Sequence, residues 1–110
     1  MTIAYLVPRG NRFGCYEYAE TIASGATGDT VFIPGLPAGK YVGVTIIAGA
    51  NSGKIQYSTS LESEVKAGTA VFQDWEMGTV SGTVTDAFVI NISAIRGVSV
   101  SGEIDIEVIV

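Results

Sequence analysis

The last nine residues, 102–110, read Gly-Glu-Ile-Asp-Ile-Glu-Val-Ile-Val, and this stretch decides the fold class. Acidic residues occupy every second position from 103 to 107, and Ile or Val occupies the positions that follow each of them. Successive side chains of an extended strand point to opposite faces. The alternation therefore predicts a β-strand with one buried face and one solvated face. The acidic side chains on the solvated face are Glu103, Asp105 and Glu107.

The rest of the chain has the same β character. Its 110 residues include 13 Val and 12 Ile against 3 Leu, together with 14 Gly and 10 Thr. Because β-branched side chains lose rotamer freedom in a helix, this composition excludes a helix bundle. With 47% hydrophobic and 15% charged residues, the chain is also not of the disordered type. Its length predicts a single domain over 1–110, with residues 1–12 either packed into it or extended as an arm.

Glycine, proline and asparagine divide the chain into segments that predict about eight short strands. Residues 41–47 are nearly continuous apolar and predict a central strand that is buried on both faces. The small residues at 49–53 predict a hairpin turn after it. A short helical turn is expected near 60–66, with Ser60 as its cap and Gly68 at its end. The pattern predicts an all-β, antiparallel β-sandwich of jelly-roll-like topology.

Several chemistries are excluded by residue type. The chain has no His and one Cys, which excludes a His-based catalytic triad, the usual zinc sites and an intrachain disulfide. Residues 48–55 fail as a phosphate loop, because Ala48 stands where its first Gly belongs and Ile55 where Ser or Thr must bind magnesium. Asp74 and Glu76 lie two apart and lack the opposed carboxylate of a glycosidase. We therefore expect no enzymatic activity, no cofactor and no metal.

The negative charge is confined to the C-terminal part. Residues 1–66 hold five acids and five bases, whereas residues 67–110 hold six acids and one base and supply the whole net charge of −5. Nucleic acid is not an expected partner, because phosphate binding needs clustered Lys and Arg. A membrane is not expected either, since no run approaches the ~18 apolar residues of a span. Without a signal-peptide pattern, synthesis in the cytosol is expected.

Two surface features have more than one interpretation. The acidic strand face has three interpretations: a solvated face that discourages edge pairing, a contact for a basic partner, or a ligand for a hard cation. The tyrosines either fill the β core and pair across strands, or present a platform on which sugars stack. The tyrosines are Tyr5, Tyr16, Tyr18, Tyr41 and Tyr57.

Residues 54–110 resemble the small virion proteins of tailed bacteriophages. The pattern is a strand, a Ser-rich helical turn, AGTAVFQDW at 67–75, a Gly-rich strand, TDAFVINISAIRGVSV at 85–100, and the terminal alternating strand. It is similar to the small β-sandwich or jelly-roll proteins that decorate or cement the phage head. The resemblance implies a virion structural protein on the capsid surface, made in the host cytoplasm, that bridges subunits of the major capsid protein.

We accordingly expect polar docking contacts from the last strand and from basic residues of the N-terminal loops. A dimer or trimer is expected as well, because self-association hides strand edges. A carbohydrate-binding or receptor-recognition module and a tail or baseplate component are the alternatives. The residues expected to dock are Arg9, Arg12, Lys40, Glu103, Asp105 and Glu107.

Overall fold

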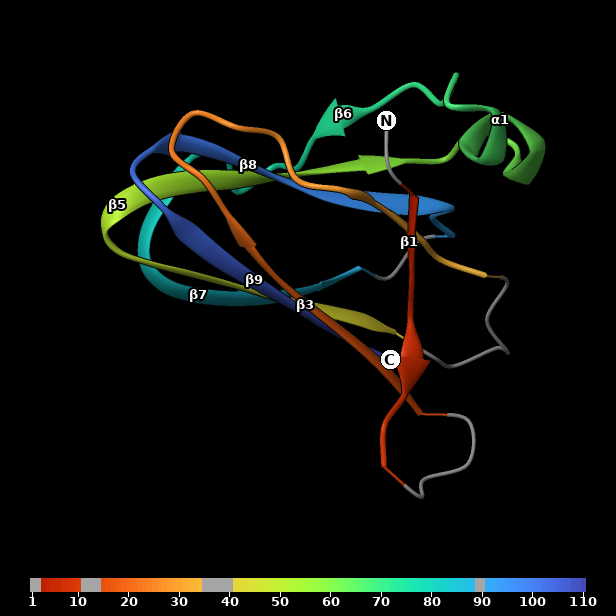
Figure 1. Ribbon diagram of the computed structural model, residues 1–110, viewed down its shortest axis with the longest axis horizontal. Helices are drawn as coiled ribbons and strands as arrows, with labels where there is room; N and C mark the ends of the chain where they lie inside the picture. Colours follow the sequence, from red (N-terminus) through yellow and green to blue (C-terminus); the bar gives the residue numbers. More distant parts are fainter. Residues whose placement is uncertain (1–2, 11–14, 35–40, 89–90) are drawn as a thin grey trace.

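The computed structural model describes residues 3–10, 15–34, 41–88 and 91–110, which form nine strands of one sheet and one short helix (Figure 1). The predicted all-β class is confirmed. In chain order the elements are β1 (Ile3–Tyr5), β2 (Val7–Pro8), β3 (Tyr16–Ile22), β4 (Thr30–Phe32), β5 (Val42–Ser58), α1 (Glu62–Ala67), β6 (Gln73–Asp74), β7 (Val80–Phe88), β8 (Ala94–Ser101) and β9 (Ile104–Ile109).

The sheet curls on itself and nearly closes into a barrel. Its strand order is β1-β4-β8-β5-β9-β3-β2, and β6 and β7 also pair with β5. Because Leu6 alone separates β1 from β2, residues 3–8 pair with β4 at one end of this order and with β3 at the other. These residues of the expected arm therefore lie in the sheet of their own chain. The β1–β4 pair is parallel, which corrects the prediction of a wholly antiparallel sheet.

Strand β5 connects two sets of strands. Residues 42–47 pair with β7 and β9, whereas residues 52–58 pair with β8. Between them the register shifts, and Gly49 adopts a φ of +58° that suits glycine. Figure 1 shows β5 turning over at this point, so that β8 lies on one side of the core and β9, β3 and β7 on the other. The predicted hairpin is wrong, because the two arms of β5 pair with different strands and not with each other.

The core lies between these two sets of strands, and β9 runs along it. Ile106 of β9 is fully buried, as predicted for the apolar face of this strand. Gly97 of β8 lies opposite, where an added Cβ would come within 2.6 Å of the Ile22 side chain. The buried hydrophobic residues of this main cluster are Ile22, Val31, Ile33, Val42, Val44, Ile46, Ala48, Ile55, Phe88, Ile95, Ile104, Ile106 and Val108.

Two predictions about burial are corrected. Residues 42–47 form a central strand, but its side chains alternate: Ile46 is buried and Ile47 is 37% exposed, because the outer side of the sheet faces solvent here. β9 is flanked by β5 and β3, so its acidic face does not guard a sheet edge. The strand lies inside the sheet, and its carboxylates form part of a broader surface.

The predicted helical turn is confirmed as α1. It ends at Gly68, as expected, with a φ of +81°. Ser60 does not cap it: the Ser60 hydroxyl accepts a hydrogen bond from the backbone N–H of Val71 at 3.0 Å, and so holds the segment that leads to β6. Val65 anchors the helix by burying its side chain against the sheet.

Candidate docking surface

The acidic side chains of β9 belong to an outward-facing surface that three strands share. Because the inward residues of β9 are buried, its alternate residues point to solvent. The register aligns them with β3 and β5 in rows, such as Ala19–Glu107–Thr45 and Thr21–Asp105–Ile47. We call this surface the outer face. Its residues are Glu17, Ala19, Thr21, Gly43, Thr45, Ile47, Asp105, Glu107 and Ile109.

The outer face combines negative charge with aliphatic surface. Three of its residues are acidic, and none of the nine is basic. The Asp105 carboxylate accepts a hydrogen bond of 2.6 Å from the Thr21 hydroxyl, which fixes its position on the sheet. Ile109 is 49% exposed and lies over Gly43, where an added Cβ would be 3.2 Å from Ile109 Cγ1. Glycine at this position thus makes room for an aliphatic side chain that stays open to solvent.

Two shallow hollows meet at Glu107. The first, of about 360 Å³, is lined by Thr21, Ile47 and Asp105 among others, and the second, of about 220 Å³, by Val7 and Ile109 among others. Ala19 and Glu107 line both. Lys and Arg side chains bury their methylene stems on apolar surface while their charged groups stay near carboxylates. The combination of aliphatic floor and carboxylate rim suits a basic side chain of a partner.

The structure brings together some of the residues expected to dock and separates others. Glu103, Asp105 and Glu107 follow one strand, with Glu103 exposed just before its start. Arg9 lies beyond the other end of β9: its N–H donates to the carbonyl of Cys15 at 2.8 Å, next to the start of β3. Arg9 and Glu103 are thus about 25 Å apart by strand rise. Arg12 and Lys40 lie outside the described residues.

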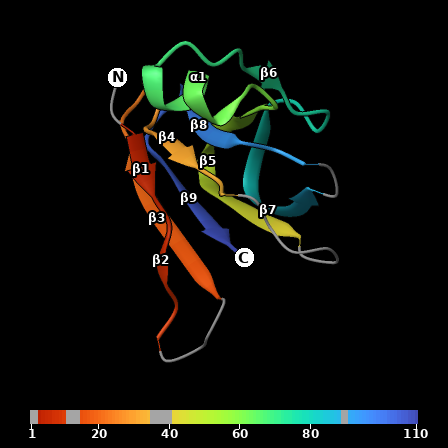
Figure 2. The same cartoon turned by 90° about the vertical axis from the view of Figure 1, so that its right-hand side faces the viewer.

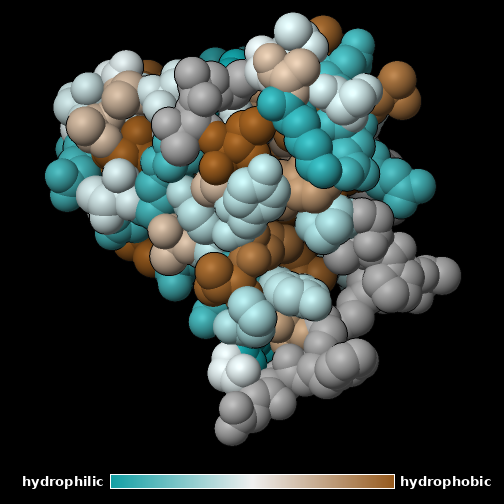
Figure 3. Space-filling model, turned by 45° about the vertical axis from the view of Figure 1, so that its right-hand side comes forward, coloured by the Kyte–Doolittle hydropathy of each residue, from teal (hydrophilic) through white to brown (hydrophobic). Residues whose placement is uncertain are grey.

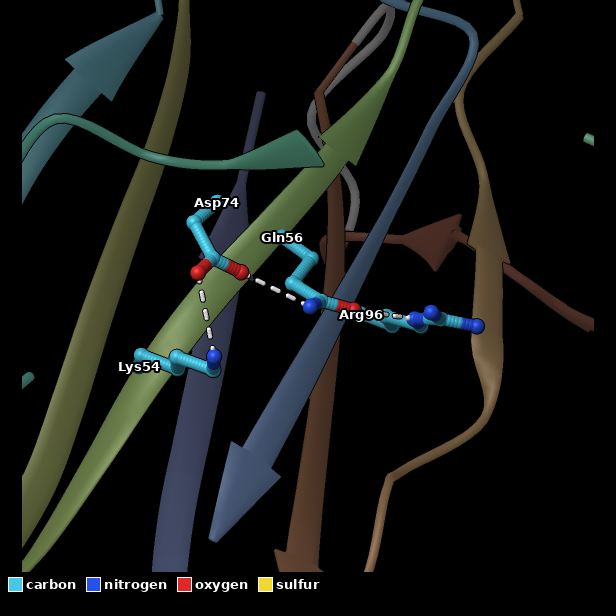
Figure 4. Close-up of polar contacts among 4 residues, drawn as sticks. All are labelled: Lys54, Gln56, Asp74 and Arg96. Atoms are coloured by element: carbon cyan, nitrogen blue, oxygen red, sulfur yellow. Dashed lines mark hydrogen bonds and ion pairs between the residues drawn. The ribbon is translucent and has the colours of Figure 1, made fainter. Parts of the chain in front are cut away.

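A second polar feature lies on the other arm of β5 and crosses three strands (Figure 4). Asp74 of β6 accepts a hydrogen bond of 2.8 Å from Gln56 Nε2 and forms an ion pair of 3.1 Å with Lys54 Nζ. Gln56 Oε1 in turn accepts a hydrogen bond of 2.7 Å from Arg96 Nε on β8. The hydrogen bond from Gln56, and then that from Lys54, lower the pKa of Asp74 below its ordinary value of 3.8. We call these four residues the β6 clasp, because they hold β6 against β5 and β8.

Sequence reasoning missed the β6 clasp and considered Asp74 only as a partner of Glu76. The guanidinium of Arg96 lies 3.9 Å above the ring of Phe72, so the clasp also holds the segment before β6. Burial lowers the pKa of Arg96. Gln56 and Arg96 are 40 residues apart, and neither carries a local signal that points to the other.

The structure separates two of the exposed tyrosines that were considered as a sugar-stacking platform. Trp75 packs against the main core cluster, where its ring stacks on that of Phe88 at 3.8 Å. Tyr16 and Tyr41 are exposed, but strand alternation puts Tyr41 on the outer face and Tyr16 on the opposite side of the sheet. In the view of Figure 3, hydrophobic residues reach the surface between hydrophilic ones.

Comparison with family models, curated proteins and solved structures finds no match to this chain. Within residues 3–10, 15–34, 41–88 and 91–110, no three His, Cys, Asp or Glu side chains are arranged to hold a metal ion. In the same ranges no helix has the length and apolar character to cross a membrane.

Proposed function

We propose that this chain is a virion structural protein that decorates or cements the capsid of a tailed bacteriophage, with the outer face docked on basic side chains of the major capsid protein. The observation that carries the proposal is the outer face itself, on which Glu107 lies between two hollows with aliphatic walls. The resemblance of residues 54–110 to phage head proteins supplies the identity of the partner.

The energetics of such docking fit a lattice. An exposed ion pair contributes about 0.2–1 kcal/mol, and salt screens it. A single contact through Asp105 and Glu107 is therefore weak. Copies that each span a junction between capsid subunits engage two subunits at once, and multivalency then raises the overall affinity by orders of magnitude. Capsid reinforcement follows from many modest contacts across such junctions.

The architecture supports the same proposal. The sheet turns over at β5, so that two sets of strands face each other across the core (Figure 1). An all-β chain whose sheet turns over in this way is compatible with the sandwich of jelly-roll-like form that the resemblance to phage proteins implies. The protein is synthesised in the host cytoplasm and ends on the capsid surface, where it associates as a dimer or trimer.

The test is binding to capsids that lack this protein. A variant with Asp105→Asn and Glu107→Gln removes two outer-face charges, and Glu62→Gln with Glu76→Gln removes two exposed charges elsewhere as the matched control. We expect co-sedimentation with capsids to fall at least tenfold for the first variant, to remain for the second, and to weaken as salt rises. If the unaltered protein does not bind, and capsids without it survive heat and chelators equally well, the cementing proposal is wrong.

Electron microscopy with a labelled copy of the chain separates decoration of the head from a place in the tail or baseplate. Label spread over the head supports decoration. Label confined to the tail overturns it and favours the tail or baseplate alternative.

A further inference from the structure

The longest free strand edge among the described residues belongs to β7. This strand has nine residues and pairs with the described part of the chain through β5 alone. Figure 2 shows β7 on the side of the sheet away from β1, β2 and β3. A long free edge presents a row of backbone donors and acceptors to any strand that can pair with it.

The backbone groups at this edge follow from the pairing with β5. The backbone N–H of Ala87 donates a hydrogen bond of 2.8 Å to the carboxylate of the preceding residue, Asp86. This N–H group therefore does not point to β5. The register with β5 is regular from Thr83 to Phe88. Because N–H and C=O groups alternate in direction along a strand, Thr83 and Thr85 also present theirs to the free edge.

The side chains at the centre of β7, residues 83–85, do little to block pairing. Natural sheet edges are usually guarded by Lys, Pro or inward-pointing charges. The sequence of β7, VSGTVTDAF, contains no Lys, Arg or Pro. Its one charged residue, Asp86, lies on the inward side with Val44, just outside this centre. The central part is the palindrome Thr83-Val84-Thr85, with both threonines exposed.

We propose that β7 pairs with β7 of a second copy of this chain, antiparallel and centred on Val84, to form a two-fold symmetric dimer. In this register Thr83 of each copy lies opposite Thr85 of the other, and about four backbone hydrogen bonds form between their outward-facing groups. Asp86 lies opposite Gly82 of the second copy, so the two carboxylates are about four residues, or ~13 Å, apart along the strands.

The side chains support this register. Within one copy the Thr45 and Thr85 hydroxyls are 2.8 Å apart in a hydrogen bond across β5 and β7. Pairing Thr85 with Thr83 of the second copy extends this threonine row across the dimer axis, and such cross-strand threonine pairs stabilise sheets. The half-buried side chain of Val84 lies next to Val84 of the second copy, on the face of the sheet opposite to the threonines. A charge-free, self-complementary centre favours a second copy over a charged partner strand.

Pairing through β7 supplies the interface for the self-association in the proposed function, and the observations behind it do not depend on the docking contacts of the outer face. Antiparallel pairing of this kind has its two-fold axis perpendicular to the sheet, so the outer faces of both copies point the same way. A monomer that still binds capsids would overturn the dimer and leave the docking proposal standing. A dimer that does not bind capsids would overturn the docking proposal and leave the dimer standing.

The test introduces charge at the two threonines. The variant with Thr83→Lys and Thr85→Lys places like charges opposite each other twice across the axis, and the variant with Thr83→Glu and Thr85→Lys places opposite charges there. Sedimentation equilibrium over a concentration series is expected to show the unaltered chain reaching twice its mass of 11.4 kDa. We expect the dimer dissociation constant to rise roughly tenfold or more in the first variant and to recover in the second. Thr21→Lys, on the outer face but far from β7, is the matched control and leaves dimerisation unchanged.

Circular dichroism melts of every variant establish that each one folds. A chain that stays monomeric at all concentrations overturns the proposal. So does a dimer that both variants leave intact, because β7 is then not its interface. A dimer that the first variant breaks and the second does not restore overturns the register centred on Val84.

Discussion

Strands β9 and β7 lie on the two sides of the same arm of β5, residues 42–47, and yet differ in burial. β9 has a second neighbour in β3, and its inward Ile106 is fully buried. β7 has β5 as its one partner among the described strands, its inward Val84 is half-buried, and Asp86 on the same side is exposed. The same supporting strand therefore gives a core strand on one side and an edge strand on the other.

The difference shows that a strand's contribution to stability depends on what covers it as well as on its pairing. Both strands satisfy backbone groups through β5, but β9 removes three large aliphatic side chains from water, whereas β7 fully buries only Phe88 at its end. Burial of such side chains contributes about 1.5–3 kcal/mol each. We infer that β9 stabilises the fold, whereas the edge of β7 remains available for association.

The largest expected effect separates these two strands directly. Ile106→Ala leaves a cavity in the core and should reduce the free energy of unfolding by about 2–5 kcal/mol. Val84→Ala, at a half-buried edge position, should cost less than about 1.5 kcal/mol. Urea denaturation followed by Trp75 fluorescence measures both. Equal losses would show that β7 is as deeply integrated as β9 and would break the comparison.

A smaller effect distinguishes the buried face of β9 from its outer face. Gly97 of β8 lies against the buried face, and Gly43 of β5 lies against Ile109 on the outer face. Gly97→Ala places a methyl group 2.6 Å from Ile22 Cδ1 on the buried side, and overpacking of this kind costs about 1–3 kcal/mol. Gly43→Ala meets Ile109 at 3.2 Å on the outer face, where that half-exposed side chain can rotate away. We expect its cost to stay within about 0.5 kcal/mol. Thermal melts of both variants check the difference, and a larger loss from Gly43→Ala would contradict it.

The alternation in β9 made its buried and exposed faces predictable from sequence, because a period of two is a local property. The number of neighbours is not local. Residues 41–47 looked buried on both faces, since hydrophobic Ile47 stands at an outward position. The glycines at 49–53 marked a real irregularity. Whether such a site reverses into a hairpin or turns a long strand over depends on which strands pair on each side, and the local residues do not record that.

The outer face was only half predictable for the same reason. Its carboxylates stand out on β9, but the hollows around Glu107 need Ala19 of β3 and Ile47 of β5, which the register alone brings beside it. Arg9 was grouped with the acidic strand by charge, and the topology puts it beyond the far end. Residue type predicted the chemistry of the face, and strand order determined its members.

The smallest expected effect concerns β6. This strand pairs with residues 56–57 of β5, in the arm of β5 that β7 leaves mostly free. It approaches β7 where the ring of Trp75 stacks on that of Phe88. The pKa of Asp74 is lowered in the fold by hydrogen bonds from Gln56 and Lys54. The clasp therefore stabilises the fold at pH values above 3.8, the ordinary value, and this contribution is lost as the pH falls through the lower folded pKa. Because Asp74 is exposed, the loss should loosen β6 without unfolding the sheet. We expect a reversible change in Trp75 fluorescence below pH 3.8 that is absent in Asp74→Asn, since the amide does not titrate. The same transition in both proteins would assign it to other carboxylates and would leave β6 held by backbone pairing and aromatic stacking alone.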